Sequence, residues 1–233
     1  MSERLHPTDR ARLVLVVSIV VTAILYLVPY GWHVAYPLML LSTLVHEMGH
    51  GVAALLVGGS FERFLMWPDG SGVAVWAGDT TGWRLGFVAA GGLLGPAVAA
   101  AAAFAAGRSL RGARNTLLVL AAILALALLL VVRNLFGFVF VAILALGLLV
   151  VARRASAEIA QLVLVFLAVQ LALSVFSRGD YLFTPVAETS GGVMPSDVGQ
   201  MESVLVLPFW FWGALCGGAS VLVLAYGVRS YWR

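Results

Sequence analysis

Long apolar runs, separated by short polar or glycine-rich connections, dominate the pattern of hydrophobic and polar positions along the chain. Each run has about the 20 residues that an α-helix needs to cross the hydrocarbon core of a bilayer. The pattern therefore predicts an all-α polytopic membrane protein with about seven transmembrane helices. The runs cover residues 13–28, 37–57, 85–106, 116–132, 135–152, 159–176 and 204–226.

One connection departs from the helical pattern, between the second and third runs. The segments FERFLMW and GVAVWAG flank PDGS, which is a Pro-Asp-Gly turn signal between two aromatic and β-branched runs. We therefore expect a small β-hairpin-like insert at residues 60–78, after the second transmembrane helix. An irregular amphipathic loop is the alternative.

The chain is expected to form one transmembrane domain over residues 1–233. Its functional parts are a helix at 37–57, the insert at 60–78, and a late loop with the final helix at 177–228. The late loop is rich in Gly, Pro and Ser, so most of it is expected to lack regular structure. The third apolar run contains Gly91, Gly92 and Gly95 near helical spacing, which predicts close packing against the second helix.

Composition agrees with a membrane protein and excludes an ordinary soluble domain. Only 11% of the residues are charged, against about 25% in soluble domains. The net charge of +3 comes from arginines in the connections, which does not indicate a nucleic-acid partner. The arginines divide equally between the two sides if the N-terminus is inside, so the orientation stays open. Arginine without lysine, together with abundant alanine, suggests a bacterial cell membrane.

Ionisable residues inside the second run, in LVHEMGHGV, indicate a metal site. His46 and His50 are four residues apart, so on a helix both imidazoles share one face and reach one metal ion. Glu47 projects about 100° further around the helix and reaches a metal-bound water without being a ligand. Zn²⁺ lowers the pKa of that water to about 7, so Glu47 can take its proton as it attacks a peptide carbonyl. The alternative, two histidines hydrogen-bonded inside a bundle, leaves a glutamate at membrane depth unexplained.

The order of HEMGHGVAALLVGG, the hairpin-like insert and AAGGLLGPAVAAA resembles the M50 intramembrane zinc metalloproteases, the site-2 protease group. The M50B-like bacterial peptidases are the most similar members. The similarity covers residues 40–107 and resumes at SDVGQMESVLVLPFWFWG. This resemblance implies that the histidine motif lies on a transmembrane helix and that a later aspartate completes the zinc site. It also implies cleavage of transmembrane segments of other proteins, often to release a regulator.

The third zinc ligand has to be chosen among late carboxylates. Site-2 proteases typically supply it from an Asn-Pro-Pro-Asp-Gly type sequence, which this chain lacks. Because a catalytic zinc has three protein ligands, we expect Asp197 to join His46 and His50. Asp197 opens the predicted final helix in the segment that resembles the M50B-like group, although an N-cap with Gln200 would also explain its position. Asp180 is the second candidate, followed by Glu188 and Glu202.

These features together predict an intramembrane zinc metalloendopeptidase in which Glu47 activates a zinc-bound water. Its partners would be a membrane-protein substrate and the lipid bilayer. The alternatives are a catalytically inactive scaffold that binds partner proteins and, less favoured, a transporter. The strands at 61–77 are expected to hold an unwound substrate as an added strand, so proline at Val73 or Val75 should abolish cleavage and leave zinc bound.

Overall fold

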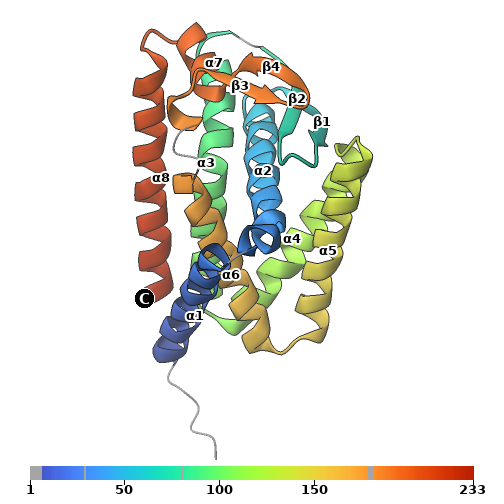
Figure 1. Ribbon diagram of the computed structural model, residues 1–233, viewed down its shortest axis with the longest axis vertical. Helices are drawn as coiled ribbons and strands as arrows, with labels where there is room; N and C mark the ends of the chain where they lie inside the picture. Colours follow the sequence, from blue (N-terminus) through green and yellow to red (C-terminus); the bar gives the residue numbers. More distant parts are fainter. Residues whose placement is uncertain (1–6, 29, 80, 178–180) are drawn as a thin grey trace, which may run out of the picture.

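The computed structural model describes residues 7–28, 30–79, 81–177 and 181–233, which form a bundle of long helices with two β-hairpins at one end (Figure 1). Six helices in these ranges are long and apolar enough to cross a membrane, and α1 contributes a shorter apolar stretch, Arg12–Leu25. The predicted all-α polytopic fold is confirmed. The long helices are α1 (Pro7–Leu27), α2 (Gly31–Leu56), α3 (Gly82–Gly107), α4 (Leu110–Leu130), α5 (Leu135–Arg154), α6 (Ala157–Ser177) and α8 (Phe209–Trp232).

The predicted hairpin after the second helix is confirmed. Strands β1 (Ser60–Met66) and β2 (Gly72–Ala77) pair antiparallel across a turn that contains Gly70 at φ 86°. The outer edge of β1 is also paired, because the Phe64 N–H donates to the Val131 carbonyl (2.7 Å) and the Phe64 carbonyl accepts from the Arg133 N–H (3.0 Å). The hairpin is therefore extended on one side by the connection between α4 and α5.

The late connection contains more regular structure than the sequence predicted. Strands β3 (Val186–Thr189) and β4 (Gly192–Pro195) form a second hairpin, which follows a short 3₁₀ helix, η1 (Tyr181–Phe183). The expectation of a mostly irregular loop was wrong here, because four-residue strands around a two-residue loop show too little periodicity to detect. The expectation that Asp197 opens the final helix was wrong: Asp197 opens a short α7 (Asp197–Val204), and the long α8 begins only after Pro208.

Small residues bring α2 and α3 into close contact, as the sequence predicted. A Cβ atom added at Gly49 would lie 2.2 Å from the Gly91 carbonyl oxygen, and one added at Gly91 would lie 2.4 Å from the Ala53 Cβ. These distances are well below a normal carbon–oxygen or carbon–carbon contact. The two helix backbones can approach this closely only because neither glycine has a side chain.

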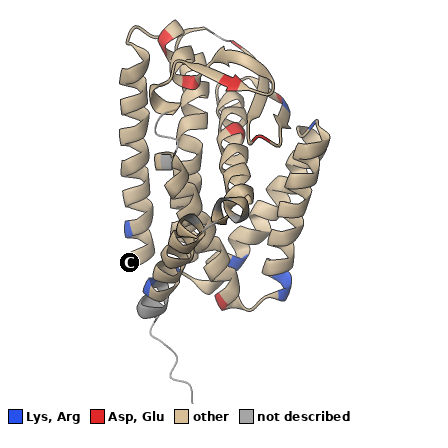
Figure 2. Cartoon of the chain, in the orientation of Figure 1, with Lys and Arg blue, Asp and Glu red and all other residues tan. Residues whose placement is uncertain are grey.

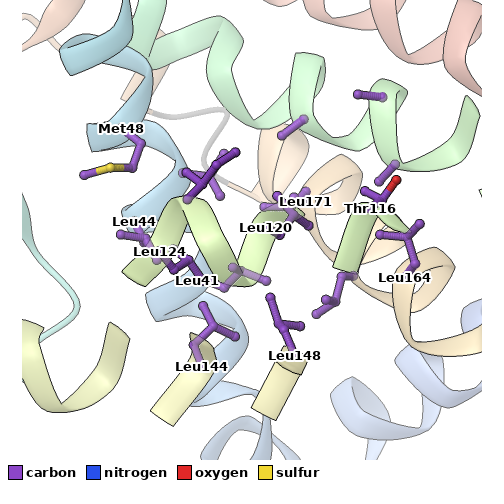
Figure 3. A pocket seen from close by; sticks show the side chains of 16 residues that line it. Leu41, Leu44, Met48, Thr116, Leu120, Leu124, Leu144, Leu148, Leu164 and Leu171 are labelled. Carbon is purple, nitrogen blue, oxygen red and sulfur yellow. The ribbon is translucent and has the colours of Figure 1, made fainter. Parts of the chain in front are cut away.

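A cavity of about 250 Å³ lies between α2 and helices α3 to α6. Figure 3 shows leucines from these helices pointing into it, with Met48 at one side. Thr116 contributes the single hydroxyl group of the lining, which contains no ionisable residue. The cavity is therefore unsuited to hydrolytic chemistry, which must be sought elsewhere.

Charge is distributed unequally along the bundle. Most arginines lie at the end where α3, α5 and α8 finish, whereas most carboxylates lie at the hairpin end (Figure 2). Arg12 belongs to the arginine-rich end, because its guanidinium lies over the Trp232 ring, 5.9 Å from the ring centroid. The equal division expected from the sequence was wrong, since it assumed that Arg12 and the hairpin insert share a side.

Candidate metal centre

The two histidines of HEMGH lie on one face of α2 and point toward the same place. Their Nε2 atoms are 3.2 Å apart, and their rings meet edge to face. The Nδ1 atom of His50 is 2.8 Å from the Val88 carbonyl oxygen on α3, so it donates there and leaves Nε2 available as a ligand. A Cβ atom added at Gly92 would lie 2.2 Å from the His50 ring. Gly92 is therefore needed for this ring position.

Asp197 reaches the histidines from the first turn of α7. Its carboxylate oxygens lie 3.1 Å from the His46 Nε2 and 3.2 Å from the His50 Nε2, and the residue is only 3% exposed. The cap of α7 is Ser196, whose hydroxyl accepts from the Gly199 N–H. The alternative role of Asp197 as the N-cap is therefore wrong, and its side chain is free to face α2.

The three side chains fit a metal ion by distance and by chemistry. His46, His50 and Asp197 form a group whose ligand atoms lie close together, with the separations of 3.1–3.2 Å given above. Ligand atoms about 2.1 Å from a tetrahedral zinc are about 3.4 Å apart, which is close to these values. The Oδ2 atom of Asp197 is buried and makes no well-directed hydrogen bond despite its proximity to His46. A bound cation would satisfy this oxygen.

The charge of Asp197 also suits a ligand. Burial by itself would raise the pKa of this carboxyl, but the imidazoles of His50 and His46 outweigh burial and hold the pKa below its usual range. The group is therefore a carboxylate at neutral pH, which is the form that binds metal.

Glu47 lies beside the three ligand candidates and is held by the first hairpin. The Ala74 N–H of β2 donates to the Glu47 Oε2 atom at 2.7 Å, and Glu47 is only 8% exposed. A Cβ atom added at Gly72 would lie 2.9 Å from the Glu47 Cγ, so β2 passes close over this side chain. Glu47, the histidines and Asp197 line one pocket of about 80 Å³, and its remaining wall comes from β2, Tyr181, the second hairpin and Gln200 on α7.

Glu188 and Glu202, two other carboxylates named from the sequence, are not at this pocket. Asp180 lies outside the described residues. Glu188 is exposed on β3, and Glu202 is exposed on α7, where it accepts from the Phe209 N–H at 3.2 Å. The structure thus brings together Glu47, His46, His50 and Asp197.

Besides the second hairpin, two parts of the pocket were missed from the sequence. The Tyr181 ring meets the His46 ring edge to face with centroids 5.9 Å apart. The Ala74 contribution is a main-chain group, so no residue type could have signalled it. Tyr181 follows directly after Asp180 in a glycine-containing connection, and a lone tyrosine there is no specific signal.

Comparison with known proteins gives one match. A family model described as Peptidase M50B-like matches residues 16–227. No curated protein and no solved structure matches the chain. The matched segment includes α2 with its histidines, both hairpins and α7 with Asp197.

Proposed function

The chain belongs to the Peptidase M50B-like family, and on that premise we propose that it is a zinc metalloendopeptidase of the site-2 protease type. Its substrates would be membrane proteins, cut in or near a transmembrane segment. The family supports a membrane peptidase acting on proteins. The observation that carries the more specific proposal is the convergence of His46, His50 and Asp197 beside a glutamate that is not one of them.

In this proposal His46, His50 and Asp197 hold Zn²⁺ through two imidazole nitrogens and one carboxylate. Three protein ligands of this kind with a fourth position left open are typical of catalytic zinc sites. When bound, zinc polarises the scissile carbonyl and makes water acidic enough to react near neutral pH. The Val88 carbonyl keeps His50 in the orientation and tautomer that ligation needs.

Glu47 is the proposed general base and acid. Its carboxylate takes a proton from the attacking water and returns that proton to the leaving amine. The hydrogen bond from Ala74 fixes one carboxylate oxygen, so the other keeps a defined position in the pocket. Since Glu47 is buried next to the ligand candidates, its proton transfers take place away from bulk water.

The open edge of β2 is the proposed binding site for unwound substrate. Phe64 and Ala74 lie opposite each other, yet the N–H of each points away from the partner strand, toward Val131 and Glu47 respectively. They are therefore a non-hydrogen-bonded pair, and the N–H groups of Val73 and Val75 point toward β1. A substrate helix has no free backbone groups until it unwinds, after which it can pair with this edge.

The register also sharpens the test of strand addition. Proline at Val73 or Val75 would disrupt the pairing between β1 and β2 itself. Proline at Ala74 spares that pairing but removes the outward N–H that holds Glu47, so Ala74→Pro tests the open edge and the Glu47 contact together.

The proposed function is tested by zinc analysis and by cleavage of a transmembrane peptide with the detergent-purified protein. We expect about one zinc per chain in the wild type and in Glu47→Gln, and little zinc in His46→Ala. Cleavage should be lost in both variants. His33→Ala is the matched control, because His33 is exposed at the start of α2 and outside the pocket; it should keep both zinc and activity. Zinc retained without turnover on any transmembrane peptide would favour the inactive scaffold.

A further inference from the structure

Two small cavities meet at His46. The pocket of about 80 Å³ described above lies on the hairpin side and contains Glu47. A second cavity of about 40 Å³ lies deeper in the bundle, between α2, α3, α6 and α8, and shares His46 and Tyr181 with the first. Apart from His46 and Tyr181, its polar lining consists of hydroxyl groups, from Ser42 on α2, Ser174 on α6 and Ser220 on α8.

Two of these hydroxyls have no partner in the described part of the chain. Ser42 is 4% exposed and Ser220 is 1% exposed, and neither makes a hydrogen bond there. Buried hydroxyls are nearly always hydrogen-bonded to protein or to water, because an unpaired one is costly. An explanation is therefore needed for two unpaired hydroxyls that line the same cavity.

Ordinary helix packing does not explain them. A serine inside a membrane-spanning helix usually donates to the carbonyl one turn earlier. Ser18 on α1 does so, because its hydroxyl donates to the Val14 carbonyl at 2.8 Å. Ser42 and Ser220 face the cavity without this bond.

Water explains them. A buried water needs about 10–15 Å³ of cavity volume and two to four polar partners. This cavity has a volume of about 40 Å³. Ser42 and Ser220 supply two hydroxyls, each of which can donate one hydrogen bond to a water and accept others from it. The cavity therefore has the room and the partners for at least one ordered water.

We propose that the Ser42–Ser174–Ser220 cavity is a water-holding site that supplies the metal centre from inside the bundle. Each cleavage consumes one water, whose oxygen joins the carbonyl carbon while its protons go to the two new termini. A substrate strand on β2 fills the hairpin-side pocket and obstructs entry of water there. The second cavity also reaches His46, and no residue of β2 lines it, so a strand on β2 leaves it open. The supply role rests on the proposed function, whereas the water binding does not.

X-ray hydroxyl-radical footprinting of the full-length, zinc-loaded protein tests the water site directly. Radicals formed from an ordered water oxidise the side chains next to it. Leu93 lines the cavity and is only 8% exposed, so bulk water oxidises it poorly. We expect Leu93 to be oxidised in the wild type and at least about threefold less in Ser42→Val/Ser220→Val, which removes the hydroxyls and fills the space. Ser18→Ala is the control and should match the wild type.

Kinetics test the supply role. The milder double variant Ser42→Ala/Ser220→Ala should lower kcat about fivefold, the change expected from losing one ordinary hydrogen bond to the stored water. KM and zinc content should not change. Glu47→Gln should keep the Leu93 oxidation although it cannot cleave, which separates this inference from the proposed function. Equal Leu93 oxidation in the wild type and the valine variant would overturn the water site. An unchanged kcat in a variant that has lost the oxidation would overturn the supply role.

Discussion

The two hairpins beside the candidate metal centre differ in how they are attached to the helices. The first, β1–β2, is held along its edge and at its turn. Its turn carbonyls accept hydrogen bonds from the hydroxyls of Tyr36 and Thr43 on α2, at 2.6 and 2.7 Å. The Asn134 amide makes two hydrogen bonds with the main chain of Met66, at 2.6 and 3.2 Å. This hairpin is thus fixed to α2 and to the connection between α4 and α5.

The second hairpin, β3–β4, has fewer attachments and is more exposed. Its loop is joined to the first hairpin by Ser190, whose hydroxyl donates to the Asp69 carboxylate (2.6 Å) and whose N–H donates to the Ser71 hydroxyl (3.2 Å). Its outward side chains, such as Val193, are largely exposed. Segments with few buried contacts open at low free-energy cost. The comparison therefore assigns positioning of Glu47 to the first hairpin and access to the pocket to the second.

The largest expected effect comes from the same substitution made in each hairpin. Ala74→Pro removes the N–H that holds Glu47 and blocks the open edge, so cleavage should fall about 100-fold or more. Glu188→Pro changes an exposed position of β3 that makes no contact with Glu47, so cleavage should fall less in this variant. Cleavage of a transmembrane peptide and zinc content measure both variants. Zinc should be retained in each, and equal activity losses would contradict the division of roles.

A second expected difference concerns stability. Asn134→Ala removes two hydrogen bonds to β1 and should lower the free energy of unfolding by about 1–3 kcal/mol. Asn115→Ala is the matched control, since Asn115 is exposed on α4. Thermal unfolding in detergent measures both variants. A melting temperature for Asn134→Ala equal to that of the control would show that this attachment is unimportant.

The attachment of the second hairpin should matter for motion more than for stability. Ser190→Ala removes the hydroxyl bond to Asp69 and should cost less than about 1 kcal/mol, because the bond is exposed. Amide hydrogen exchange should become faster across 186–195 and stay unchanged in β2. Ser203→Ala on α7 should leave both segments unchanged. If exchange across 186–195 in Ser190→Ala is equal to or slower than in the wild type, Ser190 does not attach the second hairpin to the first.

The smallest expected effect is the pH dependence of the Ser190–Asp69 contact between the two hairpins. Hydrogen bonds from Ser190 and Ser71 lower the pKa of Asp69 below its usual value. The ionised Asp69 carboxylate therefore stabilises this contact fully above the unfolded pKa of about 4. The stabilisation is lost only as the pH falls through the lower folded pKa. The distance between spin labels at positions 62 and 188 should not change from pH 8 to pH 5. A change within that range would contradict this assignment.

The sequence predicted those features that depend on neighbouring residues. His46, Glu47 and His50 could be assigned to one helix face because their spacing is local, and PDGS indicated the first hairpin. The second hairpin was missed because its strands, such as VAET, are short and lie in a Gly- and Ser-rich segment.

Features that depend on distant segments were open or missed. Whether Asp197 capped a helix or faced the histidines depended on where α7 packs against α2, and Ser196 proved to be the cap. The cavity serines lie on three helices, so no spacing in the sequence connects Ser42 with Ser220. Such features follow from tertiary packing, which a single sequence does not reveal.

The role of Asp197 is tested most directly by the zinc content of Asp197→Ala beside Asp79→Ala. Asp79 is an exposed carboxylate at the hairpin end, outside the pocket. The wild type and Asp79→Ala are expected to bind about one zinc per chain with equal affinity, and Asp197→Ala to bind it at least about 10-fold more weakly. Full occupancy with unchanged affinity in Asp197→Ala would contradict a metal centre built from α2 and α7.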